Sequence, residues 1–271
     1  MKKEKKTDIQ PLKYITVLYT LVMVLGLYVG TQLIKSIQQE EILPAVANPD
    51  APESALYIFF YILIMTGVLL VLIKLNLDLV IKLVAFIAFF GGIVVTLSSI
   101  FQALGILFAV LLMAATLWKR QNIMLLNLSL ILTVAGVGAF LGASLSVLPS
   151  LLLLVILSIY DIVAVFWTKH MVTLAEKAKG RLPFMFLIPY KGRDLGLGTG
   201  DMAIPLVFTV SVFKDYAITN ALLTAAGGLV GIISLFLYIQ NRRRITLPAL
   251  PPLTIGLIAG FAISLIPRLL L

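Results

Sequence analysis

The chain has 271 residues, of which 61% are hydrophobic and only 12% are charged. A soluble domain cannot bury so much apolar surface, and the long uncharged runs are typical of membrane-spanning helices rather than of barrel strands. The net charge of +9 is what basic residues at the ends of such helices produce, so we expect no nucleic-acid partner. Cysteine is absent and histidine occurs once, which excludes thiol chemistry and a histidine metal site. We expect neither a metal nor a cofactor.

The apolar runs, taken in chain order, predict nine spanning helices in a single all-α membrane-embedded domain, 1–271. Their expected positions are 14–34, 54–73, 79–97, 100–118, 123–143, 149–168, 195–213, 217–239 and 247–268. The first run exceeds the roughly 7 to 15 residues of a signal-peptide core, so it predicts a retained helix. The uncharged run 83–118 would be about 54 Å long as one helix, nearly twice the hydrocarbon thickness. We therefore place a turn at Ser98 and Ser99.

Basic residues predict the orientation of these spans. If the N-terminus is cytoplasmic and nine spans alternate, all but three of the 21 lysines and arginines lie inside. The three outside are Lys35, Lys214 and Arg268. This is the positive-inside pattern, and it predicts a multi-pass protein of the cell membrane with its C-terminus outside.

Glycines four residues apart predict close helix packing, because they let two backbones approach each other. The pairs are Gly138 with Gly142, Gly227 with Gly231, and Gly256 with Gly260. We interpret these residues as scaffold.

Asp161 and Asp201 are the only acidic residues inside the predicted spans. A carboxylate in hydrocarbon costs roughly 2.5 to 3.5 kcal/mol, so it indicates a functional site. The sixth and seventh spans run in opposite directions, which places each aspartate about 9 to 12 Å from the cytoplasmic boundary at 1.5 Å per residue. We therefore expect the two carboxyl groups to meet at one depth.

Two carboxyl groups that meet in a low dielectric cannot both ionise readily, so the pair holds one acid and one base. Water-mediated hydrolysis of an amide needs both, with activity falling on either side of a pH optimum. The sequence leaves open which aspartate holds the proton. Tyr160, beside Asp161, either donates its hydroxyl to the site or is only an interfacial anchor.

Glycine and proline surround Asp201. Gly196, Gly198 and Gly200 precede it and allow close backbone approach, whereas Pro205 leaves the Asp201 carbonyl without its helical partner. Irregular backbone at membrane depth is tolerated where it lines a wet cavity, so we expect a cavity wall here.

Three prolines, Pro248, Pro251 and Pro252, mark the start of the ninth span, and we expect the helix to begin at or just after Pro252. Two interpretations have equal weight. One is an ordinary proline-rich helix start. The other is an extended strip, Pro248–Leu250, that lines the cleft and offers backbone groups to a substrate.

Three motifs together resemble the presenilin and signal peptide peptidase family of intramembrane aspartyl proteases. They are Tyr160–Asp161 in the sixth span, Gly198–Asp201 in the seventh and Pro248–Leu250 in the ninth. The resemblance implies that Asp161 and Asp201 are the catalytic pair. It assigns active-site support to the neighbours of that pair and substrate contact to the proline motif. The supporting residues are Tyr160, Gly198, Thr199, Gly200 and Pro205, and the substrate-binding residues are Pro248, Ala249 and Leu250.

The resemblance also implies partners. Substrates of the family are transmembrane helices of other proteins, which must unwind locally before they are cut. The charge bias matches the presenilin orientation, whereas Thr199 departs from the leucine usual in eukaryotic members. The short loop 169–194 resembles that of a microbial, archaeal form, for which we expect no obligatory partner subunit and leave a homo-oligomer open.

Two other functions use the same residues. Paired intramembrane carboxylates also occur in proton-coupled transporters and channels, although no second copy of the motifs indicates the repeats usual there. A structural protein is the other alternative, with the aspartates as polar contacts between helices worth about 0.6 to 2 kcal/mol.

Overall fold

The computed structural model describes residues 9–119, 122–168, 185–190, 193–240 and 248–269. Within these ranges it contains nine α-helices and one two-stranded sheet. The helices are α1 (Ile9–Gln38), α2 (Glu53–Lys74), α3 (Asp78–Phe101), α4 (Leu104–Trp118), α5 (Ile123–Ser144), α6 (Val147–Val163), α8 (Gly200–Asp215), α9 (Ile218–Gln240) and α10 (Leu250–Leu269). A π-helical turn, Ala164–Thr168, follows α6, and the sheet pairs β1 (Met185–Tyr190) with β2 (Arg193–Gly198).

Six of the described helices, α1, α2, α3, α5, α6 and α9, are long and apolar enough to cross a membrane. Two shorter apolar helices, α4 and α10, accompany them. The prediction of a helical, multi-pass integral membrane protein is therefore confirmed.

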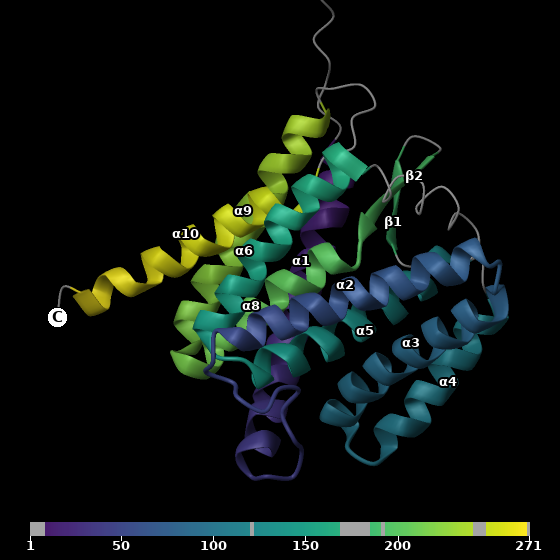
Figure 1. The fold of residues 1–271 in the computed structure, drawn as a ribbon, viewed down its shortest axis with the longest axis horizontal. Helices are drawn as coiled ribbons and strands as arrows, with labels where there is room; N and C mark the ends of the chain where they lie inside the picture. The colour runs from purple at the N-terminus through teal and green to yellow at the C-terminus, as the bar shows by residue number, and fades with distance from the viewer. Residues whose placement is uncertain (1–8, 120–121, 169–184, 191–192, 241–247, 270–271) are drawn as a thin grey trace, which may run out of the picture.

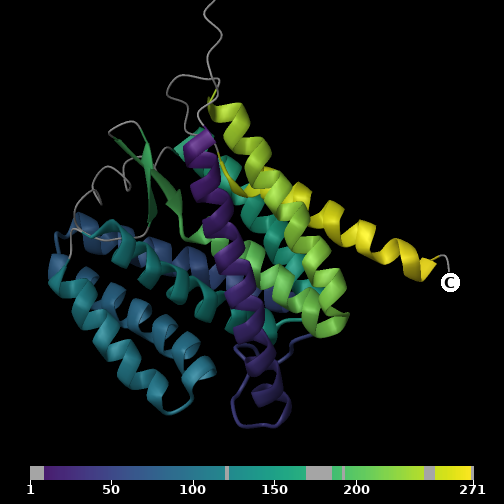
Figure 2. The same ribbon diagram turned by 180° about the vertical axis from the view of Figure 1, so that it is seen from behind.

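Helix α8 lies at the centre of the bundle, where it contacts α1, α5, α6, α9 and α10 (Figures 1 and 2). Every residue from Pro205 to Val212 is buried, so this helix is enclosed on all sides. Helix α2, by contrast, leaves most of its length exposed for lipid contact. The end of α10 extends away from the bundle in both views.

Glycine contacts join α9 and α10, as the four-residue spacing predicted. A Cβ added to Gly227 would lie 2.1 Å from the carbonyl oxygen of Gly256, and one added to Gly231 would lie 2.4 Å from that of Pro252. The two backbones therefore touch at these positions, where only glycine fits. Gly142 in α5 similarly meets the Val207 carbonyl oxygen of α8.

The predicted turn at Ser98 and Ser99 is wrong. Both serines lie inside α3, and the turn falls at Gln102 and Ala103, where Gln102 has a φ of 51°. The Ser99 hydroxyl donates to the carbonyl oxygen of Val95 at 2.8 Å. A serine that bonds back to the preceding helical turn in this way does not end a helix.

The predicted seventh span, 195–213, begins too early, because a short strand pair interrupts the otherwise helical chain there. Residues 193–198 form β2, which pairs antiparallel with β1 from Met185↔Gly198 to Tyr190↔Arg193, and α8 begins only at Gly200. Phe186 and Ile188 bury their side chains in the protein core, which anchors this hairpin. Residues 185–190 and 193–194 of the loop expected at 169–194 thus belong to a strand pair. Residues 169–184, with the single histidine, lie outside the described ranges.

The ninth predicted span also starts differently. Helix α10 begins at Leu250, so that Pro251 and Pro252 occupy its first turn rather than preceding it. Proline is tolerated there because the first N–H groups of a helix have no helical acceptor.

Candidate active site

Asp201 lies in the first turn of α8. Its carboxylate accepts a backbone hydrogen bond from Gly198, and a Cβ added to Gly198 would lie only 2.9 Å from Asp201 Oδ2. Gly198 therefore makes room for the carboxyl group as well as binding it. A Cβ on Gly200 would meet nothing within 4 Å, so the second glycine of the motif serves no such contact.

Asp161 lies in the last turn of α6, directly before the π-helical turn. Its Oδ2 accepts a hydrogen bond from the backbone N–H of Leu250 at 3.1 Å, and the Ala249 backbone contributes a second. Ala249 and Leu250 are each 8% exposed, so these bonds are shielded from solvent. The backbone at the start of α10 therefore holds the Asp161 carboxylate in place.

The structure brings the two aspartates together. Helices α6 and α8 contact each other, and Asp161 interacts electrostatically with Asp201. Each carboxylate also has its own backbone donors, from the start of α10 for Asp161 and from the end of β2 for Asp201. Paired carboxyl groups held in fixed places beside a helix start are equipped to exchange protons with a bound water.

The other predicted site residues take different places. The ring of Tyr160 packs edge-on against Phe59 of α2, with centroids 6.0 Å apart. Thr199 immediately precedes α8, and its carbonyl oxygen accepts from the Ala203 N–H at 2.9 Å. Pro205 is buried inside α8, which continues through it, and Pro248 is buried before α10.

Sequence reasoning missed Asn127 of α5. Its side-chain amide donates to the Leu187 carbonyl oxygen at 2.8 Å and accepts from the Leu187 N–H at 3.0 Å, which ties α5 to β1. The available signal was weak, since Asn127 is the only amide side chain in the predicted span 123–143.

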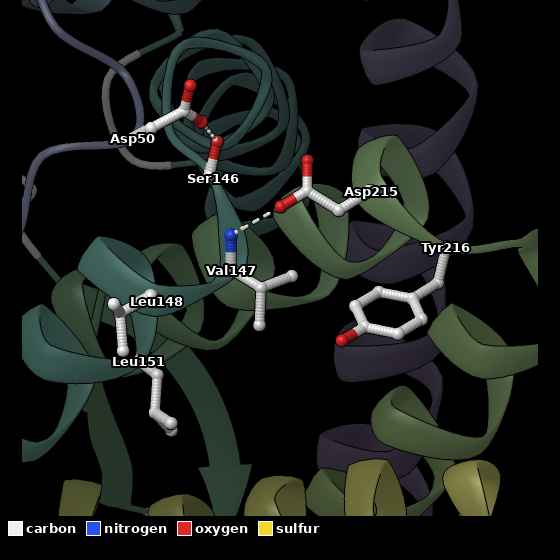
Figure 3. A pocket seen from close by; sticks show the side chains of 7 residues that line it. All are labelled: Asp50, Ser146, Val147, Leu148, Leu151, Asp215 and Tyr216. Carbon is white, nitrogen blue, oxygen red and sulfur yellow. Dashed lines mark hydrogen bonds between the residues drawn. The ribbon is translucent and has the colours of Figure 1, made fainter.

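A cavity of about 470 Å³ lies at the opposite end of α8 (Figure 3). Asp215 lines it and accepts a hydrogen bond from the Val147 N–H at 2.7 Å, while Ser146 donates to Asp50. Both carboxylates bind donors at the start of α6. This arrangement stabilises a helix end rather than forming a second pair of facing acids.

Comparisons with known proteins agree with this geometry. The model of the family described as signal-peptide peptidase, presenilin aspartyl protease, matches residues 16–268. A solved structure described as a presenilin family intramembrane aspartate protease in space group C222 is 26% identical, with a TM-score of 0.65 over 95% of this chain and 98% of that one. A second, in space group P2, is 27% identical, with a TM-score of 0.63 over 91% and 96%. No curated protein sequence matches the chain.

The fold and these likenesses define an intramembrane-cleaving aspartic endopeptidase, and they support this function over the transporter or channel alternative. The chain belongs to the signal-peptide peptidase and presenilin family of aspartyl proteases.

Proposed function

We propose that Asp161 and Asp201 are the catalytic pair with which this protease hydrolyses peptide bonds of transmembrane helices. The observation that carries the proposal is their arrangement: the carboxylates interact across α6 and α8, and each is fixed by backbone donors. Neighbouring carboxyl groups at membrane depth cost stability, so their presence there favours a catalytic role.

In the proposed reaction, the ionised carboxylate removes a proton from a water held between the pair. The water oxygen attacks the scissile carbonyl carbon while the protonated carboxyl group donates toward the developing oxyanion. As the tetrahedral species collapses, one of its hydroxyl groups returns a proton to the ionised carboxylate, the C–N bond breaks and the amine nitrogen leaves with a proton from the other carboxyl group. Both carboxyl groups return to their starting state, with one proton shared between them.

The neighbouring backbone sets the direction of each carboxylate in this scheme. Leu250 and Ala249 hold Asp161, so the motif Pro248–Leu250 acts as a positioning strip in addition to contacting substrate. Gly198 holds Asp201. Thr199, Gly200, Tyr160 and Pro205 are supporting residues in the same proposal.

The proposed topology has nine spans, with the N-terminus cytoplasmic, the C-terminus outside and the chain in the cell membrane. The charge bias supports it. Besides the six long apolar helices, the remaining three spans would be α4, α8 and α10. With 16 residues, α8 is about 24 Å long, less than the roughly 30 Å of the hydrocarbon core. Asp201 in its first turn would therefore lie below the cytoplasmic surface, with the hairpin covering it.

The proposed substrates are single transmembrane helices that unwind locally, because helical hydrogen bonds otherwise shield the scissile amide. We propose that one chain acts without an obligatory partner subunit.

A direct test incubates the purified chain in detergent with a labelled single-span peptide and measures the mass of the products. Cleavage within the apolar segment is the expected result. The matched control is a proteoliposome assay for proton or solute uptake, which the proposal predicts to be unchanged by Asp201→Asn. Uptake that requires Asp201, without cleavage of any helical peptide, would contradict the proposal.

A further inference from the structure

Asn127 makes an unusual contact with the hairpin. Through one planar amide it donates to the carbonyl oxygen and accepts from the N–H of a single residue, Leu187, at 2.8 and 3.0 Å. These are the two bonds that a residue of a neighbouring antiparallel strand would make. The side chain of α5 thus takes the place of a third strand at the edge of β1.

The register of the hairpin agrees with this arrangement. Alternate residues of a strand direct their backbone groups to opposite edges, so Leu187, whose groups meet Asn127, does not bond to its partner Gly196. Pro189 lies two residues further on and shares the same edge. Proline has no N–H, and it is tolerated where that edge of the strand carries no ladder bond.

The side chains of the two residues that flank Leu187 fix how deeply β1 lies in the protein. Phe186 is fully buried and Ile188 is 3% exposed, and both belong to the main core. Apolar burial sets the depth of the strand but is non-directional. The two hydrogen bonds between Asn127 and Leu187 fix the position of β1 along its own length, because they form at only one residue of the strand.

The hairpin leads directly to the proposed catalytic pair. Gly196 is the partner of Leu187, Gly198 is the partner of Met185, and Gly198 binds the Asp201 carboxylate. A shift of β1 by one residue would reverse which side chains face the core and would move the end of β2 with it. The position of the Asp201 carboxyl group therefore depends on the register of β1.

We propose that Asn127 is a positioning residue of the protease: its amide fixes the register of β1 against α5 and, through β2 and Gly198, holds Asp201 in place. The inference rests on the proposed role of Asp201 for its effect on cleavage. Its structural half, the fixing of β1, is measurable without any cleavage.

The test compares Asn127→Leu, which keeps the approximate size of the side chain but removes both hydrogen bonds, with Asn220→Ala. Asn220 is a matched control because its buried amide also donates two bonds, to the Ser264 carbonyl and hydroxyl oxygens, but joins α9 to α10 away from the hairpin. Hydrogen exchange at the amide of Leu187 is measured together with kcat, KM and product masses for the labelled peptide.

For Asn127→Leu we expect faster exchange at Leu187, a fall in kcat of about tenfold with a smaller change in KM, and a wider set of product masses. Asn220→Ala should leave all three as in the wild type after correction for the folded fraction. Wild-type exchange at Leu187 in Asn127→Leu, or the same changes in Asn220→Ala, would overturn the proposal.

Leu187→Pro changes the other partner of the same contact, and it keeps the test decisive if Asn127→Leu is poorly folded. Leu187→Pro removes the N–H that donates to the Asn127 side-chain oxygen. It leaves the β1–β2 bonds in place, because Pro189 already occupies the same edge of the strand. The proposal predicts that Leu187→Pro slows kcat and that adding Asn127→Leu causes less than the product of the two single effects. Multiplicative effects would overturn it. If Asp201→Asn kept full activity, the proposed function would fail instead. Hydrogen exchange at the Leu187 amide would still test whether Asn127 fixes β1.

Discussion

Helix α8 has an aspartate at each end, and the two have opposite surroundings. Asp215, its last residue, accepts a hydrogen bond from the Val147 N–H at the start of α6 (Figure 3). Asp201, in its first turn, interacts with a second carboxyl group, Asp161, at the end of α6. Both ends of the antiparallel pair α6 and α8 are therefore joined through an aspartate.

These surroundings distinguish a structural acid from a functional one. The first N–H groups of a helix lack acceptors and favour negative charge, so Asp215 stabilises the start of α6. A carboxylate beside another carboxylate can accept a similar bond, as Asp161 does from the Leu250 N–H, but the neighbouring acid opposes that stabilisation. Its presence is explained by the chemistry of the pair rather than by the stability of the fold.

The largest expected effect is at the Asp201 end. Asp161→Asn and Asp201→Asn each remove one acid–base group from the proposed pair, and we expect cleavage to fall by about 10² to 10⁴-fold or more. The measurement is the initial rate on a labelled single-span peptide. Thermal stability in detergent should be unchanged or slightly raised, since a like-charge contact is lost. A variant that cleaves at an appreciable rate would remove the distinction between the two ends.

We expect a smaller loss of cleavage when a hydrogen-bond donor is changed instead of an acid. Leu250→Pro removes the N–H that binds Asp161 Oδ2 at 3.1 Å, next to two prolines already in the first turn of α10. A hydrogen bond to a charged group is worth about 1.5 to 3 kcal/mol, so we expect cleavage to slow by about 10 to 100-fold.

Leu250→Met is the control for this change, because it keeps the N–H and the approximate volume of the side chain. Equal activity of Leu250→Pro and the wild type would show that the start of α10 does not position Asp161.

A third substitution, away from both ends of α8, shows how disturbed packing alone changes the stability of the protein. Gly227→Ala would place a Cβ 2.1 Å from the Gly256 carbonyl oxygen and should destabilise the protein by about 1 to 3 kcal/mol. Gly67→Ala in α2, where a Cβ meets nothing within 4 Å, should leave the melting temperature unchanged or slightly raised. Thermal melts of both proteins in detergent test this, and equal melting temperatures would refute the close contact of α9 and α10.

The smallest expected effect is at the Asp215 end. Asp215→Ala removes the acceptor for the Val147 N–H and should lower stability by about 1 kcal/mol, as for loss of a helix cap. Cleavage per folded molecule should stay at the wild-type level. A loss of turnover as large as that of Asp201→Asn would show that the two ends do not differ in kind.

The sequence was sufficient to predict most helices, because runs of about 20 apolar residues have few other structures in a membrane. Asp161 and Asp201 were found for the same reason, since charge is rare in such runs. The turn at Gln102 was not found. Nothing in the uncharged run distinguishes it from Ser99, whose hydroxyl is satisfied inside α3 by the Val95 carbonyl oxygen.

The hairpin was not predictable from local pattern. Its strands are short and contain Pro189, Gly196 and Gly198, which weaken any strand signal. What holds β1 in place comes from elsewhere in the chain: the amide of Asn127 and the core that buries Phe186. The bond from Leu250 to Asp161 is similarly non-local, and the proline spacing alone gave two equal interpretations.

The most direct test compares peptide cleavage by the wild type, Asp201→Asn and Asp215→Asn. Equal amounts of each folded protein are incubated with a single-span peptide, and the masses of the products are then measured. The account predicts wild-type products from Asp215→Asn, since the asparagine oxygen still accepts from Val147, and none from Asp201→Asn. Cleavage by Asp201→Asn at the wild-type position and rate would contradict it.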